Sequence, residues 1–255
     1  MKKRSLKSNS SGQVIIITAL LIATLLLSTA IYVIETEKEV PTASTGEENV
    51  FTGYLQSARN TLISALSNVT SGGDTSVLTS DLNELNTAIT SYSYQNMVQM
   101  DFTPSDMSPY QNGIWISWGT DGQGISSAYA DFTFNSSAPS TASSLEYAVN
   151  VTSEVDLSGS YQQLNDTSKQ ADLTVNLLND GEPALAQNLT FCFQNDTAGW
   201  VTVDSPSISD FGTGTYGVSF IAGTDQPTGP LPVSVLCQDQ RGIFVAANVT
   251  CNNMP

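Results

Sequence analysis

The sequence predicts an N-terminal transmembrane helix, then a helical hairpin, then a mainly β region that forms an antiparallel β-sandwich. Three observations support this prediction. An uncharged apolar run lies near the N-terminus, apolar residues at helical spacing follow it, and apolar and polar residues alternate from about residue 113 onward. The corresponding segments are a basic leader with the membrane helix, the linker and hairpin, a β module and the sandwich, at residues 1–40, 41–100, 101–157 and 158–255.

The apolar run extends from Val14 to Ile34 and has the length of a membrane span. A helix of this length covers about 31 Å, which matches the hydrocarbon core of a bilayer. Four basic residues lie before residue 8, whereas all 24 acidic residues follow the run. Because basic residues favour the cytoplasmic side, this pattern predicts a single-pass membrane protein with a cytoplasmic N-terminus and an extracellular C-terminal domain.

A cleaved signal peptide is one alternative. Ser28-Thr29-Ala30 forms a small-x-small cleavage sequence, so cleavage after Ala30 would release a secreted binding protein. The apolar run continues to Ile34, however, which a cleaved peptide does not need. A retained helix is therefore the favoured interpretation.

The basic leader, Gly12-Gln13 and the uncharged segment after them resemble the N-terminus of archaeal type IV pilin-like proteins. In that family a dedicated peptidase cuts just before the hydrophobic helix. The resemblance therefore implies a cut between Gly12 and Gln13 and assembly into a filament through the helix. A pilin-like subunit is thus a second alternative function.

Residues 50–69 and 78–92 each carry apolar side chains at helical spacing, and the sequence SGGDTS at 71–76 separates them. The two segments predict a helical hairpin in which one apolar stripe is buried against the other. Such a hairpin would serve as a stalk, or as a face that contacts a neighbouring subunit. Self-association is therefore possible.

The apolar period changes to two at Gly113. Short alternating segments separated by Asn, Asp, Gly and Pro turns predict an antiparallel sandwich. The expected strands lie near residues 113–119, 128–135, 145–157, 171–177, 189–193, 201–203, 215–221, 231–237 and 243–250.

The glycines at positions 212, 214 and 217 satisfy G-x-G-x-x-G, which binds a pyrophosphate when it joins a strand to a helix. A period-two pattern follows them, so a turn before a strand is expected instead. The segment DFGTGTYGVSF, residues 210–220, resembles an element of filamin-type and bacterial Ig-like repeats. The resemblance covers about residues 158–251 and implies an Ig-like sandwich with Tyr216 in its core.

The composition argues against several kinds of chemistry. The chain has no histidine, which excludes Ser-His-Asp and Cys-His catalysis and most transition-metal sites. No EF-hand-type calcium loop is present, and a net charge of −16 disfavours nucleic acid. We therefore expect no enzyme, cofactor or metal site. The expected partners are the membrane and an unknown protein or glycan outside the cell.

The three cysteines, Cys192, Cys237 and Cys251, all lie in the predicted sandwich, which suits an oxidising compartment. If the strands near 187–194 and 231–237 pair antiparallel, Cys192 and Cys251 lie near the same end of the sheet. We therefore expect a Cys192–Cys251 disulfide, with three free thiols as the alternative.

N-x-S/T sequons are frequent after the apolar run. Several of their asparagines occupy the strand face opposite the apolar residues, where a glycan fits. The leading hypothesis is thus a membrane-anchored extracellular surface glycoprotein with an Ig-like domain that serves structure or adhesion. The sequons start at Asn68, Asn135, Asn150, Asn165, Asn188, Asn195 and Asn248.

Overall fold

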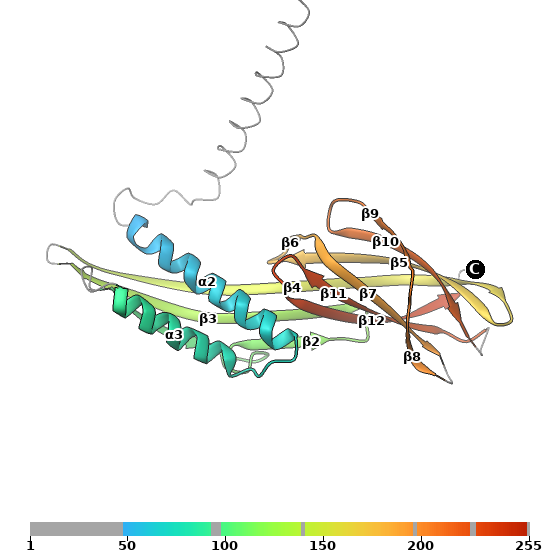
Figure 1. Ribbon diagram of the computed structural model, residues 1–255, viewed down its shortest axis with the longest axis horizontal. Coiled ribbons are helices and arrows are strands. Elements are labelled where there is room, and N and C mark those ends of the chain that lie inside the picture. Colours follow the sequence, from blue (N-terminus) through green and yellow to red (C-terminus); the bar gives the residue numbers. More distant parts are fainter. Residues whose placement is uncertain (1–47, 93–97, 139–140, 196–197, 225–227, 254–255) are drawn as a thin grey trace, which may run out of the picture. The chain divides into compact units, whose positions relative to one another are not determined.

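The computed structural model describes residues 48–92, 98–138, 141–195, 198–224 and 228–253. Residues from Asn49 onward form one compact unit. Within the described ranges this unit contains two helices and twelve strands (Figure 1).

The helices are α2 (Glu48–Thr70) and α3 (Val77–Tyr92), and they lie where the apolar spacing predicts helices. The strands are β1 (Val98–Pro104), β2 (Ile114–Trp118), β3 (Gln123–Ala138), β4 (Thr141–Asn165), β5 (Ser168–Asn179), β6 (Glu182–Pro183), β7 (Ala186–Asn195), β8 (Gly199–Thr202), β9 (Ser207–Asp210), β10 (Thr215–Gly223), β11 (Leu231–Asp239) and β12 (Phe244–Asn253).

All twelve strands belong to one hydrogen-bonded sheet. Its main path is β8-β7-β11-β12-β4-β5-β10-β9, while β3 pairs with β4 and carries β1 and β2 on its other edge. The pairings are antiparallel except that of β12 with β4, which is parallel. The predicted fold class, a membrane helix followed by an antiparallel Ig-like sandwich, is therefore wrong, because the described strands form a mixed sheet.

The length of β4 explains this difference. The strand runs for 25 residues, and the domain boundary predicted between residues 157 and 158 falls inside it. Gly159 looks like a turn residue in the sequence, but it lies where the chain is crowded. A Cβ at this position would lie 2.4 Å from Leu173 Cδ2 and 2.8 Å from Asp172 O. The glycine therefore permits close packing within the sheet instead of ending the strand.

Two hydrophobic cores lie along β4. In the first, α2 and α3 cover one face of β1, β3 and the N-terminal half of β4, with Leu62, Leu66, Phe132 and Phe134 at its centre. In the second, side chains of β4, β5 and β10 pack with those of β7, β11 and β12. Every second side chain of β4 points into a core, first Val149 and Val151 into the first core and then Val155 and Leu157 into the second. The two cores are therefore connected by one continuous strand.

The apolar stripes of the helices face the sheet. The rings of Phe51 and Tyr54 on α2 lie 6.2 and 6.3 Å from the ring of Phe134 on β3. Helix α3 packs along β1. The predicted hairpin, in which the two stripes bury each other, is therefore corrected to two helices that cover a sheet (Figure 1).

No helix in the described ranges is long and apolar enough to cross a membrane. This finding contradicts the predicted transmembrane fold, the single-pass location with an extracellular C-terminal domain, and the pilin-like subunit, so none of these is carried further. The predicted span from Val14 to Ile34 and the cleavage points at Gly12-Gln13 and after Ala30 lie outside the described residues.

A glycine turn joins the two cores where β3 begins. The amide of Gly122 donates to Asn248 O at 2.9 Å, Asn248 N donates to Gly119 O at 2.9 Å, and Leu157 N donates to Gly122 O at 2.7 Å. The turn thus bonds to both β4 and β12. Next to it, a Cβ on Gly124 would lie only 2.0 Å from Ala246 O, so the backbones of β3 and β12 approach each other closely.

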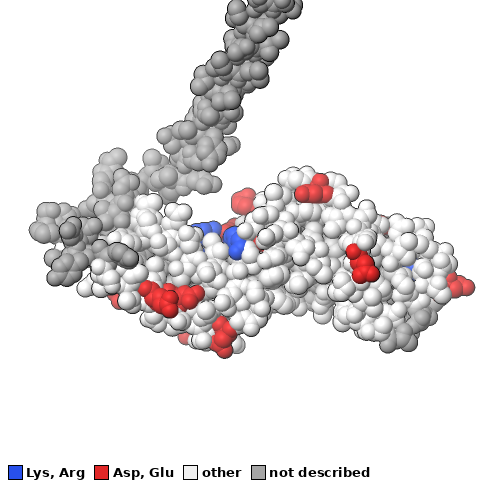
Figure 2. All heavy atoms as spheres, viewed as in Figure 1, with Lys and Arg blue, Asp and Glu red and all other residues white. Residues whose placement is uncertain are grey.

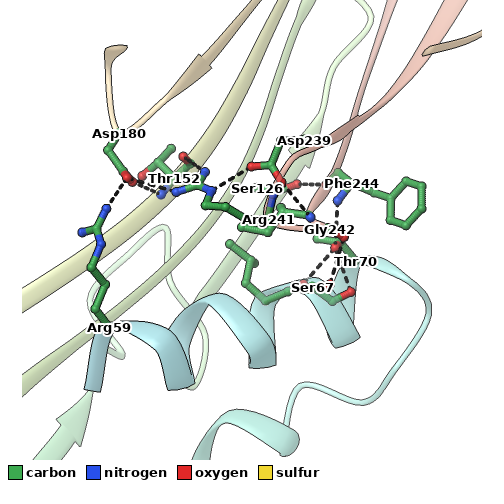
Figure 3. Close-up of polar contacts among 12 residues, drawn as sticks. Arg59, Ser67, Thr70, Ser126, Thr152, Asp180, Asp239, Arg241, Gly242 and Phe244 are labelled. Atoms are coloured by element: carbon green, nitrogen blue, oxygen red, sulfur yellow. Dashed lines mark hydrogen bonds and ion pairs between the residues drawn. The ribbon is translucent and has the colours of Figure 1, made fainter. Parts of the chain in front are cut away.

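Arg241, in the turn between β11 and β12, forms a second connection, called here the Arg241 junction (Figure 3). Its Nε donates to Asp239 Oδ2 at 2.8 Å, its Nη1 to Asp180 Oδ2 at 3.0 Å and its Nη2 to Thr152 O at 2.7 Å. Asp180 Oδ2 also accepts from Arg59 of α2, and Asp180 Oδ1 accepts from Thr152 N. Two carboxylates and two guanidinium groups thus tie α2, β4 and two turns together.

Helix α2 makes two further bonds to the same turn. Ser67 Oγ donates to Gly242 O at 2.9 Å, and Phe244 N donates to Thr70 Oγ1 at 3.1 Å. The largest basic patch on the face shown in Figure 2 lies near its middle, with acidic side chains scattered around it. Arg59 and Arg241 both form an ion pair with Asp180, so these two cationic side chains serve an internal connection.

The two arginines provide a matched test of this junction. Arg241 is 16% exposed and faces the fully buried Asp239, whereas Arg59 is 40% exposed. Arg241→Ala should lower the free energy of unfolding by about 3 kcal/mol, because it leaves a buried carboxylate without its charge partner. Arg59→Ala should cost less than about 1 kcal/mol, as is usual for an exposed ion pair. Urea denaturation measures both, and equal losses would contradict the assigned roles.

Candidate functional site

The face of β2, β3 and β4 that points away from the helices carries a cluster of aromatic and amide side chains. Trp115 lies opposite Ser127, Ser127 lies opposite Thr152, and Tyr129 lies opposite Asn150. Residues directly opposite each other on a sheet share a face, so these side chains are neighbours. With Tyr110 they form what is called here the Asn150 surface.

A loop between β1 and β2 brings Tyr110 to this surface. Asp106 Oδ1 accepts from Asn112 N at 2.9 Å, and Gly113 N donates to Ser105 O at 2.7 Å. Asn112 and Gly113 both have positive φ, which reverses the chain tightly.

The loop places three aromatic rings together. The Tyr110 ring lies 6.0 Å from that of Trp115 and 5.7 Å from that of Tyr129. All three side chains are half-buried. Their exposed parts therefore form an aromatic surface beside Asn150.

Hydroxyl groups hold the Asn150 amide in one orientation. Ser127 Oγ donates to Asn150 Oδ1 at 2.9 Å, and Thr152 Oγ1 and Tyr110 Oη make longer bonds to the same oxygen at 3.3 and 3.4 Å. The amide oxygen thus faces the sheet. Asn150 is exposed, and in the described residues its Nδ2 donates no hydrogen bond.

Tyr129 is also fixed at its hydroxyl, which donates to Asp131 Oδ1 at 3.0 Å. This hydrogen bond to the carboxylate, with smaller effects of burial and of the negative charge, raises the pKa of Tyr129. The phenol therefore stays neutral and acts as a donor at neutral pH.

Strand β4 has an open edge at this position. β3 pairs with one edge of β4 over its N-terminal half, and β5 pairs with the other edge only from Ser153 onward. Within the described strands, nothing pairs with that second edge from Thr141 to Val151, whereas the amide and carbonyl of Thr152 are bonded to Asp180 and Arg241. Asn150 therefore lies on a strand that solvent reaches from one side as well as from its outer face.

The other sequon asparagines have varied surroundings. Asn195 Nδ2 donates to Gly223 O at 3.1 Å, whereas Asn165 Oδ1 accepts from the backbone and side chain of Thr167. Asn135 and Asn248 are half-buried. Among the sequon asparagines in the described residues, the exposed ones are Asn68, Asn150, Asn165 and Asn188.

The cysteines do not form the expected disulfide. Cys192, Cys237 and Cys251 are all free. Cys192 lies opposite Ser234, whereas Cys251 lies opposite Leu231, so they point to different faces of the sheet. Burial raises the pKa of Cys237 to about 12 and that of Cys251 to about 11.

This difference predicts selective thiol chemistry. At pH 8 a thiol reagent should modify the half-exposed Cys192 quickly. Cys237 and Cys251 should react only after unfolding, because they are buried and their raised pKa values keep them protonated. Counting modified thiols by mass spectrometry, before and after adding denaturant, checks this. Fast labelling of a Cys192→Ser variant in its native state would contradict it.

The glycine-rich segment forms a turn, as its pattern predicts. Gly212 and Gly214 have φ values of 73° and 71°, and β10 begins at Thr215, so no helix follows that could hold a phosphate. The side chain of Tyr216 is buried, and its hydroxyl accepts from Ala186 N at 2.8 Å. This tyrosine thus connects β10 to β7 in the second core.

Two surface grooves of about 660 Å³ each lie outside the Asn150 surface. One is mainly apolar and lies where the end of α2 meets Ile116, Trp118, Leu236 and Phe244. The other lies near Phe193, Phe220 and the loop before β9. The described residues contain no group of three or more His, Cys, Asp or Glu side chains that could hold a metal ion.

No known protein family matches the chain, and no curated protein or solved structure is significantly similar to it. These comparisons do not test the resemblances to pilin-like proteins and Ig-like repeats.

Sequence reasoning found the asparagine of the Asn150 surface but missed its aromatic neighbours. Trp115 belongs to the segment GIWISWG, for which the alternating pattern predicts only a strand. Trp115 and the polar Ser117 are two residues apart and therefore lie on the same, outer face of the strand. This spacing alone could have indicated where the Trp115 side chain lies. Nothing in the sequence indicates that the loop carrying Tyr110 turns back over β3.

Proposed function

We propose that this chain is a structural glycoprotein, not an enzyme, in which one rigid β body keeps attached groups or partners at a fixed separation. The observation that supports this proposal best is the continuity of β4 through both cores. At about 3.3 Å per residue, its 25 residues extend for about 80 Å.

The connections beside β4 also support a rigid body. The glycine turn bonds β4 to β12, and the Arg241 junction bonds α2 to β4 and to the β11–β12 turn. A hinge between the cores would have to break both connections and bend a paired strand. Bending β4 between the cores would break several of its backbone hydrogen bonds to the neighbouring strands at once, which is energetically unfavourable.

The sequons support the glycoprotein part of the proposal. Four of the sequon asparagines are exposed: Asn68 lies on α2, Asn150 and Asn165 lie in the middle and at the end of β4, and Asn188 lies on β7. Attached glycans would therefore point away from several parts of the body without entering either core.

Spin labels at the two ends of β4 test the rigidity. In a Cys192→Ser background, labels on Glu146→Cys and Gln162→Cys, both exposed positions, should lie about 50 Å apart, and pulsed electron resonance should give one narrow distance distribution. Gly124→Ala should broaden it, because the added Cβ would clash with Ala246 O. A broad or two-peaked distribution without the Gly124 change would contradict the proposal.

A further inference from the structure

The Asn150 amide is already arranged to carry a substituent on its nitrogen. Its oxygen is held by Ser127 and Thr152, and its Nδ2 donates no bond in the described residues. Asn195 is the opposite case, since its Nδ2 is used in a bond to Gly223 O. Asn165 resembles Asn150, because its oxygen is held by Thr167, but it is the last residue of β4, whereas Tyr129 lies opposite Asn150.

The rings beside Asn150 suit a sugar. Tyr129 lies directly opposite Asn150 on the outer face, and the Tyr110 ring lies 5.7 Å from the Tyr129 ring. A pyranose has a face of C–H groups that packs on an aromatic ring, and its hydroxyl groups remain in water. Tyrosine is suited to such a contact because it is apolar on its faces and polar at its tip.

The rings are also fixed before any sugar arrives. The Tyr129 hydroxyl is bonded to Asp131, and the Tyr110 hydroxyl lies 3.0 Å from Ser127 Oγ. Ordering a free side chain opposes binding, so rings that are already ordered lose less entropy on contact.

We infer that Asn150 carries an N-linked glycan whose first sugar packs against Tyr129 and Tyr110. This inference rests on the proposed glycoprotein function and specifies the site at which the glycan becomes part of the structure. The glycan also lies beside the open edge of β4 between Thr141 and Val151. An open edge is a place where strands of other chains add, and a bulky glycan hinders such pairing.

The full chain, made in a host with N-glycosylation and in one without it, provides the test. Glycopeptide mass spectrometry should find Asn150 occupied in the first host. The glycosylated protein should melt about 2–4 °C higher than the unglycosylated protein. For a chain of this size, such a shift corresponds to a modest gain in the free energy of unfolding.

Matched variants separate the contact from a general effect of glycans. In Tyr129→Thr the melting difference between the two hosts should shrink by at least half, whereas Tyr129→Phe, which keeps the ring, should retain it. Asn165→Gln removes a sequon at the end of β4, away from the register position of Tyr129, so the difference should change little. Comparing differences between hosts cancels the direct effect of each substitution on stability.

Each other result has a defined meaning. An unmodified Asn150 beside an occupied Asn165 would overturn this inference and leave the proposed function standing. An occupied Asn150 with the same melting difference in Tyr129→Thr would overturn the packing. If no sequon is occupied, the glycoprotein part of the proposed function fails as well.

Discussion

The continuity of β4 is the constraint on which the rest of this structure depends. A strand has two edges and two faces, and β4 uses them differently along its length. One edge pairs with β3 and then, near its end, with β12, while the other is open at first and then pairs with β5. One face contributes to the first core beneath the helices and then to the second core. The positions of both cores therefore follow from a single extended segment.

The polar connections are placed where the neighbours of β4 change. The glycine turn occupies the place where β3 begins and β12 approaches, and a Cβ at Gly122 or Gly124 would lie within 2.4 Å of a backbone oxygen of β4 or β12. The Arg241 junction lies near the start of the pairing with β5, and Thr152 supplies both its amide and its carbonyl to the junction. In a chain with few cations, two arginines are used at this one place, where a buried carboxylate needs a partner.

Much of the local structure could be predicted from sequence, because periodicity reports which face of an element is buried. Both helices and most strands follow from this signal. The arrangement could not be predicted for a physical reason: Gly159 and Gly124 relieve crowding inside strands, but in a sequence they look like turn residues. The short strand β9 and the parallel contact of β12 with β4 leave no periodic signal at all.

The candidate site could likewise be predicted from the sequence only in part. The sequons are visible as residue patterns, and Asn150 is among them. The orientation of its amide and the nearness of Tyr110 depend on a loop and on cross-strand register, which are set by contacts between distant residues. Similarly, Arg59 and Arg241 are far apart in the chain, and only the fold brings both to Asp180.

Native-state hydrogen exchange, followed by mass spectrometry, tests most directly whether the two cores form one body. Amides of β1 and β3 report on the first core, and amides of β10 and β11 report on the second. If β4 joins the cores as described, the slowest amides of both should exchange with the same free energy of opening and respond equally to added urea. A first core that opens at a clearly lower free energy, while the second stays protected, would contradict this account.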